Sequence, residues 1–217
     1  IFRDVYLTEL SDCYFLDVQT KPEKSDDGWQ LFVSDSLGGE RFSGKTLAAQ
    51  LVFDHTIVRE QSCGAASQFS FFFALSDVQT WTAETPNLYA LYLTLFDGGG
   101  EVETVRVRVG FRQVRIDGER FLLNDTPIKF KGVNHHDTSP RNGYTMTPEE
   151  IERDVKLCKE FNIDTIRTSH YPPDPLLLEL ADELGIYIVD ENDLETHGTW
   201  SHQIPPTYNT ISHDPKW

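Results

Sequence analysis

Residues 128–189 alternate three short apolar runs with two amphipathic segments, and this order restricts the possible folds more than any other feature of the sequence. The apolar runs are Ile128–Val133, Ile163–Thr168 and Ile186–Val189. The last is almost continuously apolar, which is typical of a strand covered on both faces. A strand–helix–strand–helix–strand order favours parallel strands joined by right-handed crossovers. We therefore predict three neighbouring parallel strands separated in sequence by two helices.

Both intervening segments carry the local signals of helix ends. Thr147 is a predicted N-cap, Pro148 suits the first helical position, and Glu150 completes a capping box. One apolar face follows from the spacing of Ile151, Val155, Cys158 and Phe161. The second helix is predicted to begin near Asp174–Pro175 and to end at Gly185, a residue suited to the left-handed position after a helix.

Residues 1–112 show a different pattern, in which short alternating segments are separated by turn residues. The clearest predicted strands are 4–8, 46–53, 88–96 and 103–109. Polar clusters at 25–28 and 35–40 are predicted to separate the earlier strands. After them, a short hairpin is predicted from Val114 to Leu123.

These patterns predict a multidomain β plus α/β protein. Several short strands over roughly a hundred residues favour an immunoglobulin-like β-sandwich, which we assign to residues 1–112. The alternating strands and helices in residues 113–217 favour the first three βα units of an incomplete (β/α)₈ TIM barrel, since a whole barrel takes roughly 250 residues.

The overall charge excludes some classes of partner. The chain holds 19 basic and 35 acidic residues, a net charge of −16, whereas nucleic acids and anionic membranes need a cationic face. No apolar run approaches the ~18 residues that span a bilayer. Three widely spaced cysteines indicate neither a disulfide framework nor a zinc site, and favour a reducing compartment. We therefore expect no nucleic acid, no membrane and a cytoplasmic location.

Polar side chains follow each of the three predicted parallel strands. The three groups are Asn134–Asp137, Arg167–His170 and Asp190–His197. The carboxyl ends of parallel strands meet on one face, where α/β barrels keep their chemistry. Imidazoles and carboxylates on that face can bind a polyhydroxylated ligand, and Glu195 with His197 can hold a divalent metal. Taken singly, each group has a structural alternative; Asp190 and Glu191, for example, can cap the next segment or pair with a neighbouring strand.

Further segments join these strand ends in matching one known family. The matching segments are Ile1–Val5, Trp81–Tyr89, Val109–Arg112, Lys131–Asp137, Ile166–Pro172, Asp182–Glu191 and Leu194–Gly198. Through them the chain resembles glycoside hydrolase family 2 almost from end to end, and most closely its β-galactosidase branch. The β-glucuronidases of that family share the Arg-Thr-Ser-His-Tyr-Pro stretch at 167–172 but lack the Glu-Thr-His-Gly found here at 195–198.

The resemblance implies specific roles for five residues. His136 and His170 match positions that hydrogen-bond the hydroxyls of the sugar, and Arg167 matches an arginine that supports the nucleophilic carboxylate. Glu195 and His197 match ligands of an active-site Mg²⁺. The family also implies a β-galactoside substrate, an N-terminal jelly roll and a homo-oligomeric longer protein.

The same resemblance places the reacting groups elsewhere. A retaining glycosidase needs two carboxyl groups about 5 Å apart. In this family both are glutamates at later strand ends, and the acid/base follows an asparagine; this sequence contains no Asn-Glu pair. Since the chain also begins with Ile1 rather than Met, we expect an internal piece of a longer protein, without either catalytic glutamate and inactive on its own.

Two other functions remain open from the residues alone. One is a non-catalytic carbohydrate-binding or interaction module, which galactose binding by the chain without residues 113–217 would favour. The other is a metal-dependent barrel hydrolase using His135, His136, His170 and His197, which tight zinc retention would favour.

Overall fold

The computed structural model describes residues 4–193, apart from the side chain of Asp35. The first eight strands are β1 (Cys13–Phe15), β2 (Gln19–Ser25), β3 (Gly28–Gly39), β4 (Lys45–Phe53), β5 (Thr56–Gly64), β6 (Gln68–Leu75), β7 (Tyr89–Asp97) and β8 (Gly100–Val109). They are followed by β9 (Val114–Asp117), β10 (Arg120–Leu123), β11 (Thr126–Pro127), β12 (Gly132–His135), α1 (Pro148–Glu160), β13 (Thr165–Thr168), α2 (Pro175–Leu184) and β14 (Tyr187–Val189). None of the helices in this range is long and apolar enough to cross a membrane.

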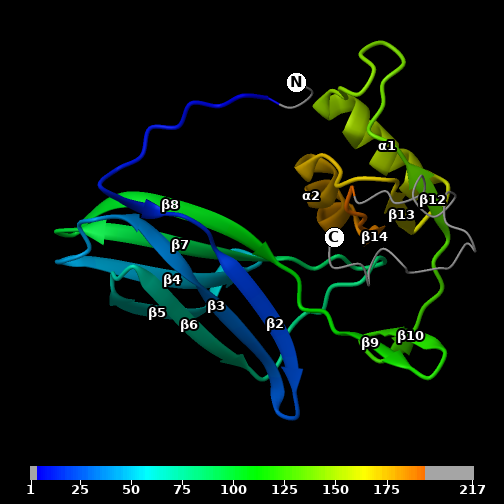
Figure 1. Ribbon diagram of the computed structural model, residues 1–217. Coiled ribbons are helices and arrows are strands. Elements are labelled where there is room, and N and C mark those ends of the chain that lie inside the picture. The colour runs from blue at the N-terminus through cyan, green and yellow to red at the C-terminus, as the bar shows by residue number, and fades with distance from the viewer. Residues whose placement is uncertain (1–3, 194–217) are drawn as a thin grey trace, which may run out of the picture.

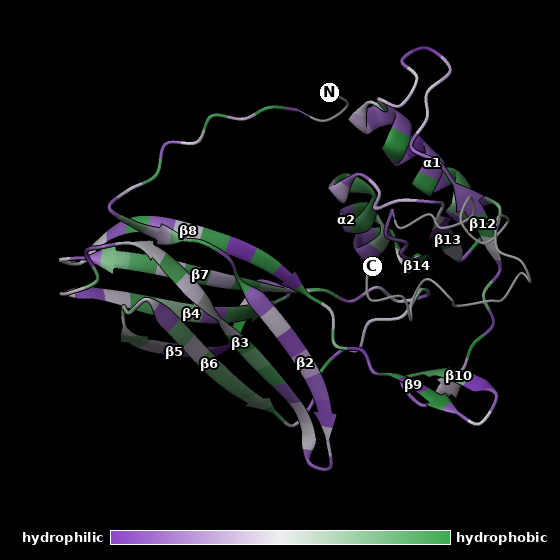
Figure 2. Ribbon diagram, in the orientation of Figure 1, coloured by the Kyte–Doolittle hydropathy of each residue, from purple (hydrophilic) through white to green (hydrophobic). Residues whose placement is uncertain are grey.

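Residues 13–109 form two antiparallel sheets that face each other, and we call them the two-sheet part (Figure 1). In the first sheet β3 pairs with β1, β2 and β6, and the second has the order β5-β4-β7-β8. The strands predicted at 46–53, 88–96 and 103–109 correspond to β4, β7 and β8. Figure 2 shows the alternation of hydrophilic and hydrophobic residues along these strands.

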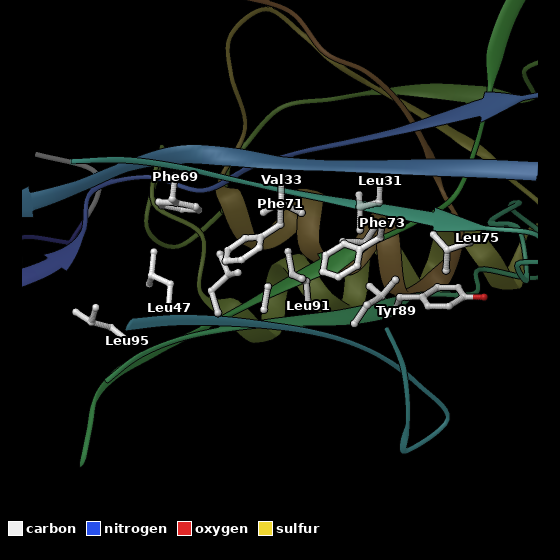
Figure 3. Close-up of a cluster of buried hydrophobic side chains, with 14 of the residues drawn as sticks. Leu31, Val33, Leu47, Phe69, Phe71, Phe73, Leu75, Tyr89, Leu91 and Leu95 are labelled. Atoms are coloured by element: carbon white, nitrogen blue, oxygen red, sulfur yellow. The ribbon is translucent and has the colours of Figure 1, made fainter. Parts of the chain in front are cut away.

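The core of the two-sheet part lies between its sheets and follows from a period of two residues. In β6, Phe69, Phe71 and Phe73 are buried while the residues between them are exposed. They meet leucines such as Leu47 and Leu91 from the opposite sheet (Figure 3). Burying one such side chain contributes about 1.5–3 kcal/mol, so this alternation is the main stabilising feature of the two sheets.

Two details of the predicted strand pattern are wrong. Residues 4–8 are in no strand, and Val5 and Leu7 are 81% and 102% exposed, because no strand edge in residues 4–193 pairs with them. The polar cluster at 35–40 does not separate strands, since β3 continues to Gly39. A glycine is needed at its end: Gly39 has φ +96°, and a Cβ there would lie 2.0 Å from the Asp12 carbonyl oxygen.

Residues 132–189 form a parallel sheet with the order β12-β13-β14 and two helices, and we call them the α/β part. Parallel strands in this order were predicted and are confirmed. The predicted first strand at 128–133 is displaced: β12 begins at Gly132, because the Lys131 N–H donates to the Asp164 carboxylate at 2.7 Å instead of joining the ladder. Within residues 4–193 no sheet closes on itself.

Both predicted helices are confirmed, but Phe161 is not on the apolar face predicted for the first one: α1 ends at Glu160, and Phe161 is its C-cap and is 73% exposed. α1 has Thr147 as its N-cap with the complete capping box to Glu150. α2 follows the N-cap Asp174 and ends at Gly185 in the left-handed conformation, with φ 75°. The helices bury Ile151, Val155, Leu177 and Ala181 in a common core with Ile166 of β13. This core fixes the strand ends that follow.

The loop at residues 81–83 joins the two parts. Trp81 is only 2% exposed, and its Nε1 donates to the Asp182 carbonyl at the end of α2 at 2.8 Å. Lys159 Nζ of α1 donates to the carbonyls of Ala83 and Gly185, at 2.9 and 3.1 Å. The α/β part is therefore anchored on a loop of the two-sheet part.

Candidate functional site

The carboxyl ends of β12, β13 and β14 bring polar side chains from three segments together. In the parallel register Arg167 lies between Asn134 of β12 and Val189 of β14. Glu191 follows Val189 by two positions. The sequence predicted that these strand ends converge, and side-chain contacts between all three are present.

Arg167 is the centre of this group. Its Nε donates to Glu191 Oε1 at 2.6 Å, and its Nη1 donates to Asn134 Oδ1 at 3.3 Å. Its Nη2 lies 3.4 Å from His170 Nδ1. A guanidinium is planar and permanently charged, so contacts on three of its edges fix both its position and its orientation.

Glu191 is held as a carboxylate by this arrangement. Partial burial raises the pKa of its carboxyl group, but the hydrogen bond and the charge of Arg167, together with His170, outweigh that effect. The net pKa is lowered from the usual glutamate value. The site therefore contains a fixed negative charge beside a fixed positive one at neutral pH.

His170 has two competing partners on one nitrogen. Its Nδ1 lies 3.3 Å from Glu191 Oε2 and 3.4 Å from Arg167 Nη2. A protonated Nδ1 donates to Glu191, whereas an unprotonated Nδ1 accepts from Arg167. The other ring nitrogen of neutral His170 then takes the opposite role, so the ring can either accept from a ligand hydroxyl or donate to one.

His136 lies next to His170. Their ring centroids are 5.5 Å apart at an interplanar angle of 74°, an edge-to-face contact, and both residues are exposed. The structure thus brings together His136, His170 and Arg167, three of the five residues selected from the sequence. Glu195 and His197, selected as metal ligands, lie outside the described residues.

His135 is used differently from its neighbour. Its Nε2 lies 3.3 Å from Asp154 Oδ2 of α1, and its Nδ1 lies 3.6 Å from Asp137 Oδ1. Asp137 is 4% exposed and also accepts the Asp174 N–H at 2.7 Å, just before α2. His135 therefore ties β12 to α1. Residues 4–193 contain no group of three or more residues suited to hold a metal, and His197 of the four-histidine hypothesis lies outside this range.

Asn134 and Thr168 were not assigned a role from the sequence, and Glu191 was assigned only a structural one. Asn134 and Glu191 hold Arg167. Thr168 accepts the Glu191 N–H at 2.9 Å and donates to Asp190 at 3.2 Å, which fixes the turn after β14. Strand register identifies them: Asn134 lies near the end of β12, Thr168 ends β13, and Glu191 follows β14 by two residues. The suggested pairing of Glu191 with a neighbouring strand is confirmed.

Two family models match nearly all of this chain. The model described as glycosyl hydrolases family 2 matches residues 13–112, and the model described as glycosyl hydrolases family 2, TIM barrel domain, matches residues 114–217. The chain belongs to glycoside hydrolase family 2. The resemblance inferred from the strand-end segments is therefore confirmed.

Curated members of the family are similar along the whole chain. It is 36% identical to a β-galactosidase of Streptococcus thermophilus, over 100% of this chain and 22% of that protein. It is 34% identical to a β-galactosidase of Clostridium acetobutylicum, over 100% of this chain and 25% of that protein. The chain thus spans a quarter or less of the length of these relatives.

The fold also occurs in solved structures. A β-glucuronidase of Bifidobacterium dentium, complexed with coumarin-3-O-glucuronide, superposes with a TM-score of 0.76 at 25% identity. The match covers 84% of this chain and 31% of that one.

Proposed function

We propose that this chain is part of a retaining β-galactosidase that hydrolyses terminal β-D-galactosyl residues. The observation that carries this proposal is the 36% identity with the Streptococcus thermophilus β-galactosidase over the whole chain. The cluster of Arg167 with Glu191, Asn134 and His170 supports the proposal, because it lies at the carboxyl ends of parallel strands, where barrel enzymes keep their chemistry. The Glu-Thr-His-Gly segment at 195–198 favours galactosidase over glucuronidase.

In this proposal His136 and His170 bind hydroxyls of the galactosyl ring. Two exposed imidazoles in edge contact offer nitrogen atoms that can donate or accept, which suits neighbouring hydroxyl groups. Since the Nδ1 atom of His170 lies within reach of both Glu191 and Arg167, the ring has a defined position before the sugar arrives.

Arg167 would support the nucleophilic carboxylate. The contacts to Glu191 and Asn134 engage two of the five N–H donors of its guanidinium, and His170 with an unprotonated Nδ1 engages a third. The remaining two donors suit one further carboxylate. A carboxylate held by charge stays ionised and ready to attack the anomeric carbon, which is the first step of double displacement.

The two reacting glutamates would come from outside this sequence, which has no Asn-Glu pair. General acid/base assistance is worth about 10²–10⁴-fold in rate, and without the nucleophile the route is closed. The 217-residue chain on its own is therefore proposed to be inactive.

The remaining assignments follow from the same family. Residues 1–112 would be an immunoglobulin-like sandwich and residues 113–217 the start of a (β/α)₈ barrel. Glu195 and His197 would bind Mg²⁺; a carboxylate oxygen is a ligand that Mg²⁺ prefers, and the ion would supply a fixed positive charge near the sugar. The longer protein would be a cytoplasmic homo-oligomer.

The test compares nitrophenyl β-D-galactoside with nitrophenyl β-D-glucuronide as substrates. We expect no hydrolysis above buffer by the 217-residue chain, and preferential hydrolysis of the galactoside by the longer protein that contains it. Preference for the glucuronide would overturn the substrate assignment. Hydrolysis by the short chain that survives repurification would overturn the placement of the glutamates.

A further inference from the structure

The outward face of the first sheet carries an ordered set of uncharged polar residues. In the antiparallel register Gln19 of β2, Ser34 of β3 and Ser70 of β6 form one row across three strands. Gln68 lies two residues before Ser70 and so on the same face. All four residues are exposed.

The adjacent row consists of Lys21 of β2, Phe32 of β3 and Phe72 of β6. Phe32 of β3 lies opposite Phe72 of β6, and their ring centroids are 5.1 Å apart. The two side chains are 38% and 43% exposed, on a face where alternation normally places polar residues. Serine side chains project less far from the sheet than phenylalanine side chains do. The serine row is therefore lower on the surface than the row with Phe32 and Phe72.

An open hollow occupies this low row. It has a volume of about 510 Å³ and is lined by Gln19, Ser34, Gln68, Phe69 and Ser70. This volume is within the range of ~300–1,000 Å³ that is usual for small-molecule sites. None of the five lining residues is ionisable, although the whole chain carries a net charge of −16.

We propose that this hollow is a second carbohydrate-binding site, specific for a neutral sugar ring. It is separate from the site around Arg167 at the ends of β12, β13 and β14, which we call the strand-end site. Carboxamides and hydroxyls each combine donor and acceptor functions, which is what pairs of neighbouring sugar hydroxyls require. The apolar C–H face of a pyranose would lie against Phe72 and Phe32, while its hydroxyls meet the serine row.

Charge complementarity selects this occupant. The lining itself is uncharged, and Lys21 in the adjacent row is paired with Glu23 at 2.6 Å, so the hollow offers no unpaired charge to a cation or an anion. The exposed amides and hydroxyls also give a second protein copy little apolar area to bury, since only Phe32 and Phe72 are large apolar residues on the two rows. A neutral, hydroxyl-rich ligand remains.

The test is a titration of the isotope-labelled 217-residue chain with lactose, followed by amide chemical shifts. We expect saturable shifts at residues 19, 34, 68 and 70. Ser70→Arg fills the hollow and should weaken this binding by about tenfold or more, which corresponds to loss of the main contacts. Phe72→Ser should weaken it as well, because it removes the apolar surface under the ring.

The matched control is Ser62→Arg, an exposed strand position on β5 of the other sheet, which should leave lactose binding unchanged. His170→Ala separates this site from the strand-end site and should also leave the shifts at residues 19, 34, 68 and 70 unchanged. Absence of those shifts up to the solubility limit of lactose, or equal weakening by Ser70→Arg and Ser62→Arg, would overturn the proposal. Neither result bears on the galactosidase assignment, which the hydrolysis assay tests.

Discussion

Arg167 shows how one side chain can organise a strand-end site. Its contacts connect β12, β13 and the segment after β14, so the geometry of the site depends on a single planar group. Lysine cannot replace it, since an ammonium group is a point charge without a planar fork. Two consequences can be measured on the chain itself.

Replacing the arginine should change the titration of its partner. In Arg167→Gln, the Glu191 carboxyl group loses the hydrogen bond and the charge that oppose the effect of burial most strongly, and we expect the pKa of Glu191 to rise. Carboxyl chemical shifts followed through a pH titration would measure it. Arg108→Gln, which removes an arginine bound to Glu179 and Glu183 instead, should leave the Glu191 titration unchanged. A similar shift in both variants would contradict a direct effect.

The same pair makes stability depend on pH. Because the pKa of Glu191 is lower in the folded state than in the unfolded chain, its ion pair stabilises the fold above the ordinary glutamate pKa of about 4.3. The stabilisation is lost as the pH falls through the folded-state value. The difference in unfolding free energy between the wild type and Glu191→Gln should therefore be largest at neutral pH and shrink on acidification, as urea denaturation at several pH values would show.

The strand-end residues also show what a sequence reveals of a site. His136, His170 and Arg167 follow apolar runs, so their position at strand ends could be predicted, and their convergence follows from parallel topology. The partner of His135 could not be predicted in this way, because Asp154 comes from the helix α1, 19 residues away, and its contact depends on how that helix packs.

At the scale of elements, helix ends were predictable because their chemistry is local. Thr147 and Gly185 act on groups within four residues of themselves. Strand ends were less predictable because pairing is not local. Residues 35–40 are rich in residue types that favour turns. They nevertheless pair with β1 and β6, and this pairing extends β3 to Gly39.

The capping box of α1 provides a prediction at this scale. Thr147→Ala removes the hydroxyl that accepts the Glu150 N–H, and we expect a loss of about 1 kcal/mol in unfolding free energy. Thr138→Ala, at an exposed loop position before the same helix, should stay within about 0.5 kcal/mol of the wild type. Equal losses in thermal or urea unfolding would mean that the cap does not matter.

The whole molecule depends on the junction between its two parts. Gly185 has φ +75°, and a Cβ there would lie 2.3 Å from the Ala83 carbonyl oxygen of the opposing loop. Arg108 adds ion pairs from β8 to Glu179 and Glu183 of α2. The end of α2 therefore fits the loop at residues 81–83 only with a glycine in this place.

Gly185→Ala should accordingly lower the unfolding free energy by more than the conformational strain of a left-handed alanine alone would. Gly118 has a similar φ of +60° with nothing near its missing Cβ, so Gly118→Ala measures the strain without the clash. We expect Gly185→Ala to cost about 1–3 kcal/mol more, as is usual for overpacking at a close contact. Calorimetry would measure both variants, and equal melting temperatures would show that the junction yields without cost.

The contact of Trp81 with Asp182 also has a consequence for synthesis, because the two residues are 101 positions apart. Ribosomes release the N-terminal region first, at about 5–20 residues per second, so residues 81–83 are synthesised seconds before their partners on α2. The two-sheet part can thus be complete when the end of α2 emerges, and serve as its template. A circular permutant that begins near residue 113 and places the two-sheet part last reverses this order. In that permutant α1 and α2 would be synthesised first, and their apolar surface would stay exposed until the loop at residues 81–83 is made.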